Sequence, residues 1–212
     1  MPRYIKLSET KSTNSYLAGT ASALPGGTVI YTYRQTAGRG QKGNSWESED
    51  NQNLAFSYLL KSPHIEPSRQ FFISEAVSLA VADMLSQYVP EGISIKWPND
   101  IYYRDQKICG ILIENTLLGS HIGHSIIGVG ININQERFVS DAPNPVSLKN
   151  ITGDDYDLEQ LLREVNERIE RLTDFSQADE EALRQLHARY ISRLYRADGK
   201  AHQWQLPTGE CF

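Results

Sequence analysis

A glycine-rich segment between Gln35 and Trp46 carries the residue types best suited to binding an anion. Three glycines fall within positions 38–43, and Arg39 and Lys42 are interleaved with them. Glycine lets backbone N–H groups turn toward an anion at little steric cost, and the arginine fork matches a phosphate. This pattern predicts a mobile loop that closes over a phosphorylated or adenylylated ligand.

The spacing of these glycines also fits G-x-G-x-x-G, the pattern of dinucleotide-binding and protein-kinase loops. A dinucleotide-binding loop opens a helix at once, whereas residues 44–51 have no apolar helical period. The chain contains neither H-R-D nor D-F-G, which argues against a protein kinase. A solvated hairpin tip is the remaining alternative for the loop taken alone.

A second polar cluster, Ser12-Thr13-Asn14, precedes a short stretch that begins at Tyr16. Serine, threonine and asparagine are favoured helix caps, because their side-chain oxygens accept hydrogen bonds from unpaired backbone N–H groups. The same groups can bind a neutral polar ligand head, such as a urea or an amide. The residues alone leave both interpretations open.

Three further blocks follow the glycine-rich loop. K-W-P-N-D occupies positions 96–100, K-I-C-G-I-L-I-E occupies 107–114, and G-V-G-I-N-I-N occupies 128–134. Lys107 lies where a hairpin turn re-enters the predicted sheet. Glycine inside a strand weakens it and often marks the close approach of a ligand, which points to the segment 128–134.

Strand and helix patterns mark the elements that must position these groups. The clearest helix starts at Pro67 and carries an apolar stripe from Ile73 to Tyr88. Two further helical stripes follow position 153, and Asp157 with Gln160 resembles a capping box. Strands are expected at 4–7, 28–34, 53–60, 93–97, 101–103, 108–114 and 125–134.

Composition narrows the class of protein. The chain has 212 residues, of which 40% are hydrophobic and 22% charged, as in an ordinary globular domain. It lacks an apolar run of bilayer length and a signal-peptide pattern, and its two cysteines, Cys109 and Cys211, suggest neither a disulfide framework nor a zinc site. A reducing cytoplasm is the expected location. The net charge of −5 argues against a general nucleic-acid binder.

Taken together and in order, the five blocks resemble biotin–protein ligases, and the resemblance runs from about Tyr4 to Leu194. It implies an α+β fold like that of class II aminoacyl-tRNA synthetases and biotin synthetases, with helices on one face of a mixed sheet. It also implies two reactions: biotin and MgATP form biotinyl-5′-AMP, and the biotinyl group then passes to a lysine of a biotin carboxyl carrier protein domain.

The resemblance implies a role for each block. Lys107 is the first choice for the catalytic cation between the biotin carboxylate and the α-phosphate, and Arg39 is the second. Residues expected around biotin are Ser12, Thr13, Asn14, Gln35, Gly38, Arg39, Gly40, Gln41, Lys107, Gly110 and Gly128. Residues expected around ATP or the adenylate are Arg39, Lys42, Trp46, Lys96, Asn99, Asp100, Lys107 and Asn132, with Asp100 and Asn132 as candidates for binding Mg²⁺.

The chain also differs from fuller members of the family. No DNA-binding helical domain precedes Tyr4, so we expect no DNA partner and no membrane partner, and a homodimer is a family-level expectation. Residues 1–195 are interpreted as the catalytic domain, and the tail 196–212 as the start of a small β-barrel domain cut short. Gln41 stands where many relatives carry a second arginine.

Two other functions stay open at this point. One is a lipoate ligase or octanoyltransferase of the same superfamily, against which the G-R-G loop and K-W-P-N-D argue. The other is a biotin-binding module without catalysis, against which the retained Lys107, Arg39 and Asn132 argue.

Overall fold

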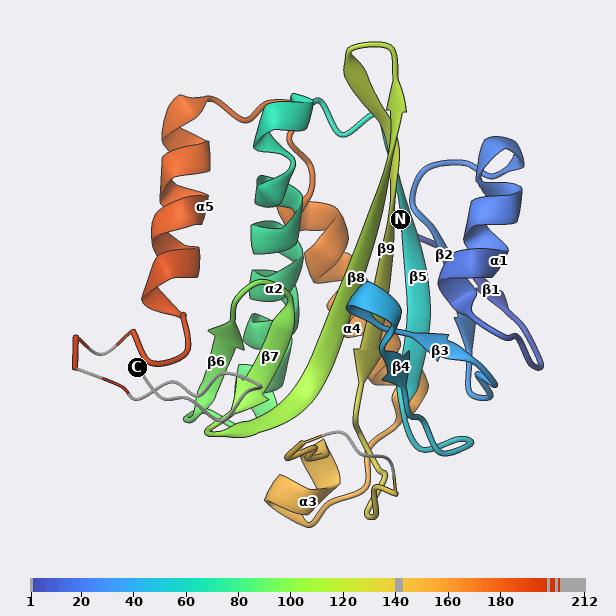
Figure 1. Ribbon diagram of the computed structural model, residues 1–212, viewed down its shortest axis with the longest axis vertical. Coiled ribbons are helices and arrows are strands. Elements are labelled where there is room, and N and C mark those ends of the chain that lie inside the picture. Colours follow the sequence, from blue (N-terminus) through green and yellow to red (C-terminus); the bar gives the residue numbers. More distant parts are fainter. Residues whose placement is uncertain (1, 140–142, 198, 201, 203–212) are drawn as a thin grey trace.

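The computed structural model describes residues 2–139, 143–197, 199–200 and 202. A seven-stranded sheet forms its centre, with the strand order β1-β2-β5-β9-β8-β7-β6 (Figure 1). The first pair is parallel and the other pairs are antiparallel, so the sheet is mixed, as the sequence predicted. The seven strands are β1 (Arg3–Lys6), β2 (Thr28–Thr32), β5 (Leu54–Lys61), β6 (Ile93–Lys96), β7 (Asp100–Tyr103), β8 (Gln106–Leu118) and β9 (His121–Ile131).

Five α-helices and three short 3-10 turns complete the described part of the chain. The longest helix, α2, is preceded by the turn η3 that Pro67 opens. The α-helices are α1 (Thr13–Thr20), α2 (Phe71–Tyr88), α3 (Leu148–Thr152), α4 (Leu158–Leu172) and α5 (Glu180–Ser192), and the 3-10 turns are η1 (Ala21–Ala23), η2 (Gln41–Gly43) and η3 (Pro67–Arg69).

The three long helices α2, α4 and α5 lie on one side of the sheet, and α1 lies on the other (Figure 1). The larger core contains alternate residues of β9, among them Ile127 and Val129, packed with residues of the long helices. A smaller cluster joins Ile126 of the same strand to Leu17 of α1. Because successive side chains of a strand point to opposite faces, the even-numbered residues of β9 from Ile126 to Gly130 lie on the α1 face, whereas Ile122, beyond a register shift, packs in the larger core.

The hairpin of β8 and β9 is longer than predicted and brings the glycine motifs together. Gly110 pairs with Gly130 across the two strands, and Leu112 pairs with Gly128. All four residues lie on the same face of the sheet as α1, and α1 covers one end of this face. Side chains are therefore small or absent along part of this face, which leaves room above the sheet.

Two local features differ from the sequence analysis. No strand was expected between positions 35 and 53, but the glycine-rich loop contains the short strands β3 (Gly38–Arg39) and β4 (Ser45–Trp46), which pair with each other. Asp157 does cap α4, but the side chain of Gln160 bonds Glu164 and does not complete a capping box.

The predicted tail 196–212 lies mostly outside the described residues, so its division from a domain at 1–195 stays a prediction. Across the described residues, every helix is too short or too polar to cross a membrane.

Candidate active site

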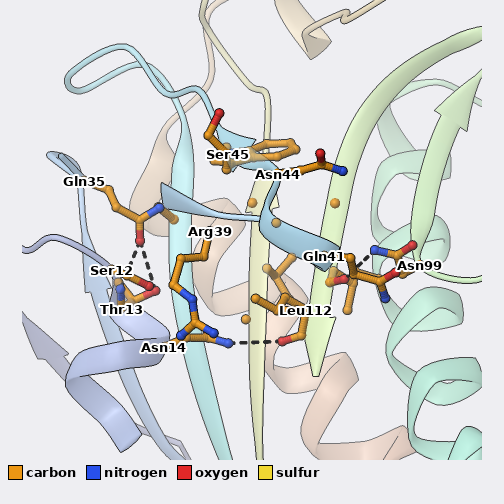
Figure 2. A pocket seen from close by; sticks show the side chains of 18 of the residues that line it. Ser12, Thr13, Asn14, Gln35, Arg39, Gln41, Asn44, Ser45, Asn99 and Leu112 are labelled. Carbon is orange, nitrogen blue, oxygen red and sulfur yellow. Dashed lines mark hydrogen bonds between the residues drawn. The ribbon is translucent and has the colours of Figure 1, made fainter. Parts of the chain in front are cut away.

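Two neighbouring cavities lie on the α1 face of the sheet beneath the glycine-rich loop. Figure 2 shows the first of them. The first measures about 170 Å³ and the second about 630 Å³. Trp46, Asp100 and Lys107 line both cavities and so stand at their boundary. The first cavity is lined by Ser12, Thr13, Asn14, Gln35, Arg39, Gly40, Gln41, Asn44, Ser45, Trp46, Ala55, Phe56, Asn99, Asp100, Lys107, Gly110, Ile111, Leu112, Gly128, Val129 and Gly130.

The far end of the first cavity is polar, and its hydrogen bonds fix the orientation of Asn14. Asn14 Nδ2 donates to the Leu112 carbonyl oxygen at 3.2 Å and to Glu114 Oε2 at 2.9 Å. Asn14 Oδ1 lies 2.5 Å from Ser57 Oγ, which is buried within β5. Because both amide hydrogens are used, Asn14 can offer a ligand only the acceptor Oδ1.

Gln35 supplies a hydrogen-bond donor at the same end of the cavity. Its Oε1 accepts a hydrogen bond from the Thr13 backbone N–H at 3.0 Å, which directs Nε2 elsewhere as a donor (Figure 2). Ser12 accepts from the Ser15 N–H as the N-cap of α1, while Thr13 and Asn14 face the cavity. The helix-cap interpretation is thus confirmed for Ser12, and Thr13 and Asn14 stay candidates for binding a ligand.

The strand glycines allow side chains to lie directly on the sheet. A Cβ at Gly128 would lie 2.1 Å from Asn14 Oδ1, a distance that no real contact reaches. A Cβ at Gly130 would lie 2.4 Å from the Trp46 ring, and one at Gly110 would lie 2.9 Å from it. The indole thus rests on the backbone of β8 and β9, where only glycine leaves space.

Lys107 and Asp100 form the charged pair at the boundary of the cavities. Lys107 Nζ lies 2.8 Å from Asp100 Oδ1, with side-chain exposures of 32% and 20%. The contact is an ion pair without the angles of a directed hydrogen bond, since Oδ1 has no hydrogen-bond partner in the described chain. Asn99 fixes the preceding turn by donating to the Ile111 carbonyl at 2.8 Å.

Cys109 lies on the opposite face of β8 and takes no part in this cluster. Burial raises the pKa of its thiol, and the charge of Asp100 raises it further. A fully buried, protonated thiol is not a nucleophile.

Arg39 points to the same polar end of the first cavity as Asn14, away from Lys107. Its Nη2 lies 2.6 Å from Glu114 Oε1, and its Nη1 donates to Ser15 Oγ at 3.2 Å. Glu114 is four residues along β8 from Gly110, a separation of about 13 Å in an extended strand. The structure therefore does not bring the guanidinium of Arg39 together with Lys107.

The second cavity contains a further lysine and a buried amide. Lys96 Nζ lies 2.9 Å from the Tyr102 hydroxyl and 4.6 Å from the centre of its ring. Asn132 donates to the Val146 carbonyl at 3.1 Å. Both residues line this cavity with Asp100 and Lys107. Searching the described residues finds no cluster of three or more His, Cys, Asp and Glu side chains that could hold a metal ion alone.

Most of the predicted site residues line one of the two cavities. Gly38 is absent from both linings, although a Cβ there would lie 2.5 Å from the Trp46 carbonyl oxygen. Lys42 lies in η2, and its side chain is outside the described part. Sequence reasoning gave no role to Ser57, Glu114 or Gly130. A serine inside the apolar run of β5 was the available signal for Ser57.

The sequence and the fold match a known class of protein. The sequence profile described as the biotin/lipoate A/B protein ligase family matches residues 7–132. The chain therefore belongs to the biotin/lipoate A/B protein ligase family.

Individual relatives are similar over parts of their length. The bifunctional ligase/repressor BirA of Escherichia coli (strain K12) is 32% identical over 133 residues, which cover 63% of this chain and 41% of that protein. BirA of Bacillus subtilis (strain 168) is 32% identical over 167 residues, covering 78% of this chain and 47% of that protein. The chain thus spans less than half the length of these relatives.

A solved structure extends the likeness to nearly the whole chain. The biotin protein ligase from Aquifex aeolicus in complex with biotin and ATP superposes with a TM-score of 0.78 at 29% identity. The match covers 92% of this chain and 79% of that one. This likeness confirms the predicted fold class.

Proposed function

We propose that this chain is a ligase that activates biotin with ATP and transfers it to a lysine of a biotin carboxyl carrier protein domain. The observation that carries the proposal is the polar end of the first cavity, where Asn14 presents an acceptor and Gln35 a donor. A cyclic urea has two N–H donors and a carbonyl acceptor, so it complements both groups. The dithiolane of lipoate has neither.

The position of Lys107 supports adenylation. In the first step a biotin carboxylate oxygen attacks the α-phosphorus of ATP, forming the mixed anhydride and releasing pyrophosphate. Two anions must approach each other, and a preorganised cation lowers that barrier. Lys107 stands at the boundary of the cavities, where a carboxylate in the first would meet a phosphate in the second.

In the second step the neutral amine of the carrier lysine attacks the acyl carbon, and AMP leaves with the bonding electrons of the anhydride. The resulting amide retains one N–H, and one proton is released from the amine. The carrier as acceptor, a homodimer and a cytoplasmic location are parts of this proposal that rest on the family resemblance.

Groups around the second cavity suit a nucleotide. Trp46 offers an aromatic surface, and Lys96 a second cation. Asp100 and Asn132 would hold Mg²⁺, because hard oxygen ligands suit this ion and one or two carboxylates usually suffice when phosphate and water complete its shell. Bound Mg²⁺ would neutralise phosphate charge. Asp100 Oδ1, which pairs with Lys107 and accepts no hydrogen bond from the described residues, fits this role.

Arg39 and Lys42 are proposed to join the adenylate when the glycine-rich loop closes. For Arg39 this requires release from Glu114, an exposed ion pair of the kind that contributes little to stability. The loop is expected to gain hydrogen-exchange protection with biotinyl-5′-AMP.

Two measurements test the proposal. Mixing the protein with biotin and MgATP should release pyrophosphate, and calorimetry should detect binding of biotin but not of lipoate. Binding of biotin without pyrophosphate release would favour a binding module. Preference for lipoate would favour the lipoate ligase of the same superfamily.

A further inference from the structure

Glu114 divides its two carboxylate oxygens between two parts of the proposed biotin site. Oε2 accepts a hydrogen bond from Asn14 Nδ2 at 2.9 Å, and Oε1 lies 2.6 Å from Arg39 Nη2. Asn14 belongs to α1 and Arg39 to the glycine-rich loop, so one side chain on β8 touches both of the elements that cover the first cavity.

The contact with Asn14 selects one orientation of its amide. A carboxylate oxygen and a backbone carbonyl oxygen can only accept hydrogen bonds. Glu114 and the Leu112 carbonyl therefore both require Nδ2 on their side, and Oδ1 must face Ser57 and the cavity. Without Glu114, the amide loses one of the two acceptors that hold it and can turn to present N–H groups to the ligand.

The contact with Arg39 can open and close. The side chains of Arg39 and Glu114 are 45% and 36% exposed, and ion pairs at such positions contribute little to stability by themselves. Arg39 also reaches Ser15 of α1, so it crosses the end of the cavity from the loop to the helix (Figure 2). Such a contact can hold the loop over the biotin end of the cavity, and it can be released when Arg39 moves to the adenylate.

We infer that Glu114 is a positioning residue that fixes Asn14 as the hydrogen-bond acceptor for the urea head of biotin and fastens Arg39 of the glycine-rich loop over that head. The inference rests on the proposed function. It also explains why the last residue of K-I-C-G-I-L-I-E is a glutamate, although the two residues before it on the same strand face are Leu112 and Gly110.

The test compares Glu114→Ala and Glu114→Gln with the wild type by steady-state pyrophosphate release. Alanine removes both acceptors, so KM for biotin should rise by about 10-fold to 100-fold. Glutamine has a single acceptor oxygen for two donors and should restore part of the loss. In both variants KM for ATP should be unchanged, and kcat at saturating biotin should stay within about threefold of the wild type.

The matched control is Glu180→Gln, because Glu180 pairs with Arg69 on the surface outside both cavities. Its KM values should equal those of the wild type. Hydrogen exchange at residues 38–40 in the presence of biotin should be faster in both Glu114 variants than in the control, since the loop has lost its fastening.

The outcomes separate this inference from the proposed function. A wild type that releases no pyrophosphate with biotin and MgATP would overturn the proposed function itself. An active wild type with an unchanged KM for biotin in Glu114→Ala would overturn only the role of Glu114. Equal rises in KM for biotin and for ATP would also overturn it, because they indicate general damage. If the alanine variant fails to fold by circular dichroism, the same criteria apply to the glutamine variant.

Discussion

Replacing Gly128 with alanine would place one methyl group against the side chain that defines the head of the cavity. The new Cβ would lie 2.1 Å from Asn14 Oδ1, 2.7 Å from its Cγ and 2.9 Å from its Nδ2. The amide must retreat by roughly 1 Å or more to reach ordinary van der Waals separation. Gly128 lies inside the central pair of strands β8 and β9, so the backbone has little freedom to yield.

The cost follows from the contacts that hold Asn14. If the new methyl group expels the amide, Asn14 loses its hydrogen bonds with the Leu112 carbonyl, Glu114 Oε2 and Ser57 Oγ. Two neutral hydrogen bonds at about 0.5–1.5 kcal/mol each and one to a carboxylate at about 1.5–3 kcal/mol give a loss of about 2.5–6 kcal/mol in unfolding free energy. Biotin should bind at least about 100-fold more weakly, because its acceptor has moved.

Denaturant unfolding measures the loss of unfolding free energy, and calorimetry measures the weaker binding of biotin. A double-mutant cycle then shows whether both effects arise from the clash with Asn14. In an Asn14→Ala background, Gly128→Ala should be almost neutral, because no side chain remains to clash. Gly19→Ala on α1 is the matched control, since nothing lies within 4 Å of a Cβ there, and it should stabilise the helix by about 0.5–1 kcal/mol. Equal penalties for Gly128→Ala with and without the Asn14 side chain would refute this reasoning.

Three further predictions follow. Lys107→Ala should lower pyrophosphate release by about 10²-fold to 10³-fold in a folded protein, because one preorganised charge is lost; an unchanged rate would contradict that role. Gln41 lines the first cavity, and Gln41→Arg should slow the release of preformed biotinyl-AMP by the equivalent of about 1–3 kcal/mol if water is excluded from the new contact. Equal release rates of the variant and the wild type at low salt would mean that another group already holds the adenylate. Burial raises the pKa of the Glu75 carboxyl, and contact with His187 opposes part of this rise. Because the folded protein disfavours the ionised carboxylate, the free energy of unfolding falls as the pH rises through that raised pKa. Glu75→Gln should therefore raise the melting temperature near neutral pH by about 2–4 °C for each kcal/mol gained, and this advantage should vanish near pH 4; a gain that grows in acid would contradict the sign.

The sequence predicted the sheet and the long helices because their signals are local. β-Branched and aromatic residues mark β2, an apolar run marks β5, and an apolar stripe marks α2. The resemblance also predicted that the five sequence blocks lie close together in the fold, because it assigned Asn14, Lys107 and the other block residues to one site. The placement of Arg39 could not be predicted, because its partner Glu114 is 75 positions away and either end of the cavity would suit a cation.

The role of Gly130 was missed for a related reason. A glycine in a strand indicates a close approach, but the sequence does not say which group approaches. Trp46, an expected nucleotide contact, is the group that rests there, and it comes from a loop 84 positions earlier. Pairings of this kind depend on the register between β8 and β9 and on how the loop folds back.

The division of β9 between its two faces has a consequence for how such a protein can change its ligand. Ile127 and Val129 pack with the long helices, whereas Gly128 and Gly130 face the cavities. Selection or protein engineering can therefore alter specificity at one set of positions while the alternate set preserves folding. The same arrangement forbids a shift of the strand by a single residue, which would exchange the two sets at once. An insertion within this hairpin should thus be far more damaging than several simultaneous substitutions along its ligand-facing side.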